Sequence, residues 1–443
     1  MSREPAGGDA VTARNRELLN LFLVGILTAA GFASVYLASQ DVPAFSTASL
    51  SYAAFFLALF LAAHLVLRLT LPNADPYLLP LAGLLTAIGL TMIYRIEPDQ
   101  AFRQGAWVVV GVVLFAAVCI FLRDHRRLDA FKYTLGVAAI VLLVLPAVPG
   151  LGHTVNGATL WVKLGPIAFQ PGEFAKVLLV VFLAGYLRDN RELLSIGSAR
   201  FGIPSPKHFG PLLVIWGGAM LVLFQTHDLG GGLLYFALFL AMLYVATARW
   251  PYVVVGLVLF ALGAWGIYQV VPHVASRVSI WLDPWSDPYE TSYQLVQSIY
   301  AIAGGGLFGA GLGRGVLLNA QGSPYIPYLD TDFIYSAIAQ ELGLVGAAAV
   351  VLLYLVFVYR GFRIAIQADD GLSKLLSAGL TSVLAIQSFI IIGGVSGLIP
   401  LTGITLPFVS YGGSSVVANF LLLALLLVVS NHVNRGFRPG GER

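Results

Sequence analysis

Residues 326–359 have the sequence IPYLDTDFIYSAIAQELGLVGAAAVVLLYLVFVY, in which two carboxylates, Asp330 and Asp332, stand directly before a long apolar run. About 20 apolar residues suffice to cross the hydrocarbon core of a bilayer as a helix, so Phe333–Tyr359 is a predicted membrane span. Asp332 is expected in the first helical turn, where the helix dipole favours an ionised carboxylate, with Thr331 or Asp330 as the cap. Capping alone explains these side chains as well as a functional role does.

Outward from this stretch, apolar runs of similar length recur along a chain of 443 residues that is 58% hydrophobic and only 11% charged. This composition predicts an all-α polytopic membrane protein with about twelve transmembrane helices. The predicted spans are Leu18–Ala38, Ala48–Leu69, Tyr77–Tyr94, Ala106–Leu122, Phe131–Val148, Glu173–Leu187, Pro211–Phe224, Leu229–Ala246, Tyr252–Val271, Phe333–Tyr359, Lys374–Val395 and Ser414–Asn431.

Lys and Arg gather in alternate connecting segments, which places both termini in the cytoplasm. The chain then divides into a tail (1–17), five helices (18–149), a core (150–432) and a second tail (433–443). The uncommon polar residues collect in the extracytoplasmic loops of the core, which are 150–172, 272–332 and 397–413. The largest of these loops precedes the tenth helix, so the sequence predicts extracytoplasmic chemistry.

Several classes of protein are excluded. A single cysteine, Cys119, rules out a disulfide framework and a cysteine metal site, and its place in an apolar run suits a lipid-facing or core position. Residues 1–20 show no removable signal peptide. A net charge of +3, with basic residues scattered between spans, gives no basis for nucleic-acid binding. The glycines of 304–315 follow no strand and are therefore not a dinucleotide fingerprint.

Two further outer segments place polar residues at helix starts. Glu173 and Lys176 are three residues apart, hence on one helix face, where they can pair. Such a pair either neutralises itself near the headgroups or is functional, because ionisable groups at membrane depth are costly. Asp228, before three glycines, is either an N-cap or a site residue. Trp161 is equally well explained as an interfacial anchor.

The remaining candidates lie in glycine-rich segments. Arg314 either meets a phosphate or belongs to a solvated turn. The segment 397–415, which contains Ser410, is too polar and broken for a span and is expected to fold back into the membrane, either as a structural turn or as a lining of the same cavity. His227 has no partner at metal-ligand spacing, so a metal role is not expected for it.

Four motifs in order resemble the SEDS (RodA/FtsW/SpoVE) family of cell-wall proteins, over about residues 156–431. They are Gln170-Pro171 with Glu173-Phe174-Ala175-Lys176, then Asp228-Leu229-Gly230, then Thr331-Asp332-Phe333-Ile334 with Glu341-Leu342-Gly343, and finally the run from Pro407 to Ser415. Five spans rather than the common three precede the first motif, so the chain resembles a longer, twelve-span, RodA-like variant.

The resemblance implies a peptidoglycan glycosyltransferase that polymerises lipid II at the outer face of the bacterial cytoplasmic membrane, for cell elongation and shape or for division. It implies a class B penicillin-binding transpeptidase as partner, and a divalent cation, Mg or Mn, with unknown ligands and no organic cofactor. Asp332 matches the catalytic aspartate. The predicted substrate-binding residues are Glu173, Lys176, Asp228, Trp161, Gln170, Arg314 and Ser410.

The chain departs from the family pattern at several motif positions, which puts in doubt any role of the replaced side chains. These departures are Gly172 for a serine, Thr226-His227 for a proline, Asp330 for a histidine and Gln340 for a glutamate.

Two other functions stay open. A lipid II flippase or other multi-span transporter would use charges such as Glu173, Lys176 and Glu341, and should have polar groups on both sides of the membrane midplane. A scaffold that only recruits the transpeptidase would not need the outer carboxylates.

Overall fold

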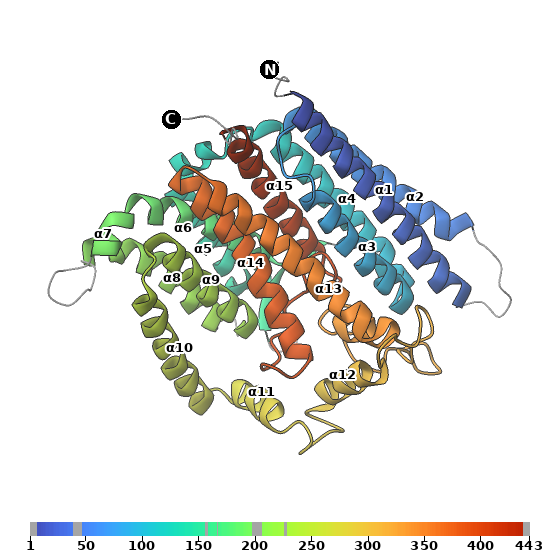
Figure 1. Ribbon diagram of the computed structural model, residues 1–443. Coiled ribbons are helices and arrows are strands. Elements are labelled where there is room, and N and C mark those ends of the chain that lie inside the picture. The colour runs from blue at the N-terminus through green and yellow to red at the C-terminus, as the bar shows by residue number, and fades with distance from the viewer. Residues whose placement is uncertain are drawn as a thin grey trace. The chain divides into compact units, whose positions relative to one another are not determined.

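A computed structural model of the chain describes residues 7–38, 47–155, 158–165, 167–196, 206–225 and 228–436 (Figure 1). Within these ranges ten helices are long and apolar enough to cross a membrane, which confirms the predicted all-α polytopic fold. Two other predicted spans coincide with α6 (Pro171–Asp189), which carries Glu173, Lys176, Arg188 and Asp189, and with α8 (Pro206–Gln225). The count of twelve spans stays a prediction.

The chain forms two compact packing units, each assembled from separated segments. The first unit comprises residues 1–123, 271–360 and 387–427. Its helices are α1 (Gly7–Ala38), α2 (Thr47–Thr70), α3 (Leu78–Ile96), α4 (Pro98–Phe121), α11 (Pro272–Leu282), α12 (Tyr293–Gly304), most of α13 (Ile334–Gln367), and parts of α14 (Gly371–Val395) and α15 (Gly413–Gly436). Helix α1 packs against α2 and α3, and α4 packs against the same two helices. Cys119 is buried in this unit, as expected for core filler.

The second unit comprises residues 124–270, 361–386 and 428–443. It contains α6, α8, the short helices η1 (His125–Phe131) and η2 (Leu145–Ala147), α5 (Lys132–Val144), α7 (Arg191–Ile196), α9 (Leu229–Thr247) and α10 (Trp250–Val270). Helix α6 packs against α5 and α9. The sequence-based segments follow chain order, whereas both packing units combine parts of the chain that are far apart in sequence.

A small antiparallel sheet occupies most of the predicted loop 150–172. Its strands are β1 (Gly152–Val155), β2 (Ala158–Leu164) and β3 (Ile167–Phe169), in the order β1-β2-β3. Trp161 pairs with His153 across β1 and β2. The turn into β3 contains Gly165 at φ 62°, a left-handed conformation that glycine adopts without steric cost. The motif residues Asn156 and Gly157 lie outside the described residues.

The predicted loop 272–332 contains two helices. Helix α11 has Pro272 in its first turn, where a missing N–H costs nothing. Helix α12 buries Leu295, Val296, Ser298 and Ala301, at spacings that place them along one face. Both helices are short, with 11 and 12 residues, so their periodicity is a weak signal in the sequence.

Helix α13 is interrupted at Gly343, which has φ 66° and ψ −168°. A Cβ at Gly343 would collide with backbone atoms of Gly309 and Leu307, so only glycine fits. The glycine run therefore packs closely against α13, with Leu344 N donating to Gly306 O (2.9 Å). Helix α13 begins at Ile334, so the predicted place of Asp332 inside the first turn is wrong: it lies two residues before the helix.

A cluster of buried charged and polar side chains lies at the other end of α13. Arg14 Nη1 donates to Glu17 (2.6 Å), whose second oxygen contacts His64 Nδ1 (2.6 Å). Arg360 of α13 pairs with Asp75, which precedes α3. About 26 residues of helix separate this cluster from the Asp332 turn, a distance of order 40 Å. The interpretation that uncommon polar residues collect only in the outer loops is therefore incomplete.

Candidate active site

The candidate catalytic carboxylate lies on a tight turn that ends at helix α13. The carbonyl of Tyr328, a residue with φ 62°, accepts hydrogen bonds from the N–H groups of Thr331 (3.2 Å), Asp332 (3.0 Å) and Phe333 (3.2 Å). The turn thereby holds the Asp332 backbone through three convergent bonds. Its left-handed tyrosine is a strained conformation of the kind that concentrates at functional sites.

A second segment pins this turn from the side. Ser410 Oγ donates to the Thr331 carbonyl and accepts from Leu406 N (2.9 Å), and Tyr411 N donates to the Asp330 carbonyl (2.9 Å). Ser410 is only 1% exposed, and both its hydroxyl bonds go to backbone groups. The structure thus gives Ser410 a positioning role, and direct contact with substrate stays a prediction.

Asp332 lies in a setting that makes its carboxylate more basic. Burial raises the pKa of Asp332 to about 6; the Arg277 guanidinium opposes this rise and the Asp330 charge adds to it. Asp332 Oδ2 lies 3.7 Å, and Arg277 Nη2 lies 3.9 Å, from the position that a Cβ would take at Gly403. Gly403 has φ 72°, so the backbone conformation itself favours glycine here. Because Gly403 has no side chain, none lies between the Asp332 carboxylate and the Arg277 guanidinium at this position.

Arg277 is a candidate site residue that the sequence interpretation does not identify. It belongs to α11, and its Nη1 donates to the Leu401 carbonyl (3.0 Å). The sequence predicts a loop where α11 forms, so the sequence gives no reason to place Arg277 near Asp332. The available signal was a lone basic residue in an apolar segment of the outer loop.

Asp330 adds a second carboxylate to the same turn. It is 8% exposed, and burial raises its pKa, with the Glu97 charge adding to the rise. Among the described residues its buried Oδ2 has no hydrogen-bond partner. Asp330 is not the N-cap of α13, because the helix begins four residues later, at Ile334.

A separate group of predicted site residues lies in the second unit. Lys176 Nζ and Glu173 Oε2 form a buried pair at 2.6 Å, as the three-residue spacing predicted. Asp228 is the N-cap of α9, accepting from Gly231 N at 2.7 Å, which confirms the capping alternative. Tyr235 of α9 donates to the Gly172 carbonyl at the start of α6 (2.9 Å) and so ties the two helix starts together. A substrate-binding role for Glu173, Lys176 and Asp228 stays a prediction.

The other predicted residues are placed as follows. Gln170 occupies the N-cap position of α6 without a side-chain capping bond. Trp161 lies in β2 and is partly buried. Arg314 is exposed in the glycine run, and its N–H donates to Gly311 O (3.0 Å) in a turn, which fits the solvated-turn alternative. Glu341, left open as a structural group, is buried and bonded to Arg95 (3.1 Å) and to two backbone N–H groups of the glycine run.

The helices long and apolar enough to cross a membrane define a polytopic membrane protein. Next to one long span, a hydrogen-bonded turn holds a carboxylate with a raised pKa, which is an enzyme-like site. The chain belongs to the FtsW/RodA/SpoVE family of cell cycle proteins, whose family-wide sequence profile matches residues 76–435. It is 44% identical to the peptidoglycan glycosyltransferase RodA of Mycobacterium tuberculosis, covering 96% of this chain and 92% of that protein. It is 36% identical to the stage V sporulation protein E of Bacillus subtilis, covering 81% of this chain and 98% of that protein.

Solved structures show the same fold. A chain of a peptidoglycan synthase complex, described as coordinating polymerization and crosslinking, matches with a TM-score of 0.66 and 29% identity. That match covers 81% of this chain and 97% of the other. The rod shape determining protein RodA of Thermus thermophilus matches with a TM-score of 0.59 and 26% identity, covering 81% and 96%. The match to family and fold confirms the resemblance drawn from the four motifs.

Proposed function

We propose that this chain is a peptidoglycan glycosyltransferase that polymerises lipid II into glycan strands at the outer face of the bacterial cytoplasmic membrane, serving cell elongation and shape or division. The names of its relatives support the activity. The observation that carries the proposal is Asp332, a carboxylate held on a three-bond turn with a pKa raised to about 6. A group with a pKa near the working pH is suited to general base catalysis.

In the proposed reaction the 4-hydroxyl of the acceptor sugar attacks the anomeric carbon of the donor. Asp332 accepts the hydroxyl proton as the new glycosidic C–O bond forms, and the bond between the anomeric carbon and the diphosphate oxygen breaks. Undecaprenyl diphosphate leaves with the electron pair of that bond. A positioned base contributes about 10²–10⁴-fold to such a step. Arg277 keeps Asp332 ionised near neutral pH by opposing the effect of burial.

A divalent cation is part of the proposal. Within the described residues no cluster of three or more His, Cys, Asp or Glu could hold a metal. Mg²⁺, however, commonly binds one or two carboxylates together with substrate phosphates. Asp330 fits this pattern as a carboxylate ligand, because it shares the turn with Asp332 and its Oδ2 has no partner in the described structure. When bound, the cation would neutralise charge on the leaving diphosphate.

The proposed partner is a class B penicillin-binding transpeptidase. Support comes from the structural match to a chain of a peptidoglycan synthase complex. The ten helices within the described ranges that are long and apolar enough to cross a membrane support a multi-pass location in it. The active site is proposed to face the cell exterior, where the lipid-linked sugars and the cell wall meet.

Transport of lipid II is the alternative, and one observation favours it: the cluster at the far end of α13, in which Arg14, Glu17, His64 and Asp75 are buried and Arg360 is partly buried. These charges, however, are paired with one another. The test is to incubate labelled lipid II with the purified chain and its co-purified transpeptidase in detergent micelles, which have no compartments. Glycan strands on a gel would support the polymerase, whereas lipid II left intact in micelles but moved across liposomes would establish the transporter.

A further inference from the structure

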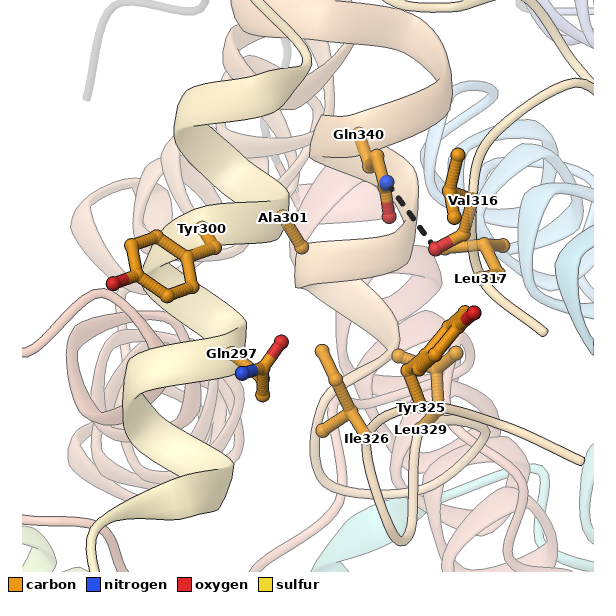
Figure 2. A pocket seen from close by; sticks show the side chains of 9 residues that line it. All are labelled: Gln297, Tyr300, Ala301, Val316, Leu317, Tyr325, Ile326, Leu329 and Gln340. Carbon is orange, nitrogen blue, oxygen red and sulfur yellow. Dashed lines mark hydrogen bonds between the residues drawn. The ribbon is translucent and has the colours of Figure 1, made fainter. Parts of the chain in front are cut away.

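A cavity of about 230 Å³ lies in the first unit, beside the turn that carries Asp332 (Figure 2). Helix α12 contributes one wall, the loop before α13 a second, and α13 itself a third. Its lining includes Gln297, Tyr300, Ala301, Tyr325, Leu329 and Gln340. We call this cavity the amide pocket. No site residue predicted from the sequence lines it.

The lining of the amide pocket is polar but uncharged. None of its lining residues is acidic, basic or a histidine. In the described structure the Gln297 amide has no hydrogen-bond partner, and Gln340 uses its amide nitrogen in one long bond to Val316 O (3.4 Å), which leaves the Gln340 carbonyl oxygen available. A pocket without charges does not compensate a diphosphate or a carboxylate, so its ligand is neutral.

Apolar and aromatic groups complete the lining. Ala301 and Leu329 are buried, whereas the rings of Tyr300 and Tyr325 are exposed at the rim. Figure 2 shows both amides and the Tyr325 ring around the same space. Flat rings beside amides suit a ligand that has an apolar face and an edge of hydroxyl or amide groups.

The walls of the pocket are held in place before any ligand arrives. On α12, Ser298 contacts Ser336 Oγ of α13 (2.6 Å) and donates to Val395 O (2.7 Å). In the loop, Tyr325 N donates to Leu317 O (3.0 Å), and the Tyr293 hydroxyl donates to Tyr325 O (3.0 Å). Rigid walls spare a ligand the cost of ordering them.

The pocket and the candidate base share one structural element. Leu329, which is fully buried, stands between Tyr328 and Asp332 in the turn closed by the Tyr328 carbonyl. A ligand against Leu329 therefore contacts the turn that positions the base. The cavity is smaller than the roughly 300–1,000 Å³ of sites for drug-sized molecules, so it suits a single sugar ring.

We propose that the amide pocket holds one neutral, N-acetylated sugar unit of the glycan strand while Asp332 acts on a neighbouring unit. The inference rests on the polymerase function proposed above. Sugar hydroxyls and an acetamido group supply the donors and acceptors that Gln297 and Gln340 need, and the ring face packs on tyrosine. A growing strand held in this way stays on the enzyme between additions, so the pocket favours long products.

The test uses the purified full chain with its co-purified transpeptidase. Saturation-transfer NMR measures binding of N,N′-diacetylchitobiose, a neutral N-acetylated disaccharide, with maltose as the non-acetylated control. Gln297→Leu removes one amide, and Ala301→Phe fills the cavity from α12. Gln321→Leu makes the same change at an exposed position of the same loop and is the matched control.

We expect diacetylchitobiose to bind the wild type and Gln321→Leu, and binding to fall about fivefold or more in Gln297→Leu and Ala301→Phe, as for the loss of one or more hydrogen bonds. Glycan strands made from labelled lipid II should become shorter in both pocket variants. Binding and strand length unchanged in both would overturn the inference and leave the polymerase intact. Loss of the co-purified transpeptidase would show instead that the pocket binds a protein segment, which also overturns it. If the wild type makes no strands but binds the disaccharide, the proposed function fails and sugar binding stands.

Discussion

Arg277→Gln should move the acid limb of the polymerisation rate to higher pH. A carboxylate acts as a base only when ionised, so the rate should rise with pH through the pKa of Asp332, which is about 6. Arg277 lowers that pKa. Asp332 Oδ2 and Arg277 Nη2 lie 3.7 and 3.9 Å from one point, so they are at most about 8 Å apart. At that separation two unit charges interact by about 2 kcal/mol at an effective dielectric constant of 20, and salt reduces this. Removing the guanidinium should therefore raise the pKa of Asp332 by about one unit.

The consequence is largest near pH 6. There the ionised fraction of Asp332 should fall from about one half to about one tenth, a fivefold loss of rate, whereas at pH 9 the two rates should converge. The assay is the initial rate of labelled lipid II polymerisation between pH 4.5 and 9. The control is Arg363→Gln, which removes an exposed arginine near the other end of α13. An acid limb that stays in place, or that moves to lower pH, would refute the electrostatic link between Arg277 and Asp332.

Three other predictions follow from packing and pairing. Glu341→Gln should lower the unfolding free energy in detergent by about 2–4 kcal/mol, because Arg95 loses its buried, negatively charged partner. An unchanged melting temperature would contradict this. Gly343→Ala should have a lower melting temperature than Gly266→Ala, since only Gly343 has a positive φ and neighbouring backbone atoms where the Cβ would be. Equal melting temperatures would contradict this. Lys176→Met should lower folded yield by leaving Glu173 buried and unpaired, and the double variant with Glu173→Gln should regain yield yet lose at least about tenfold in activity. A fully active double variant would make the pair purely structural.

The sequence predicted most of the fold because long apolar runs have few alternatives in a membrane. The spans that end at Tyr94, Leu122 and Tyr359 all correspond to observed helices. Short elements in the outer loops were missed. The strands β1 to β3 and the helices α11 and α12 are short, so their local pattern is weak and tertiary contacts decide the conformation.

The candidate site was predicted in part. Asp332 and the Glu173–Lys176 pair stand out as charges beside apolar runs, which is a local signal. Arg277 and Ser410 reach the Asp332 turn only through folding, because 55 and 78 residues separate them from it in sequence. The amide pocket could not be predicted at all, since its glutamine, tyrosine and alanine side chains carry no signal until α12, the loop before α13 and α13 itself meet.

The measurement that tests the central claim most directly is strand synthesis from labelled lipid II by three matched proteins: the wild type, Asp332→Asn, and Asp283→Asn. Asp283 is an exposed aspartate of the same loop, whose Oδ1 accepts from Trp285 N (3.2 Å), and asparagine keeps that bond. We expect strands from the wild type and Asp283→Asn, and at least a hundredfold loss in Asp332→Asn with normal expression and transpeptidase binding. Full strand synthesis by Asp332→Asn would contradict the assignment of the catalytic base.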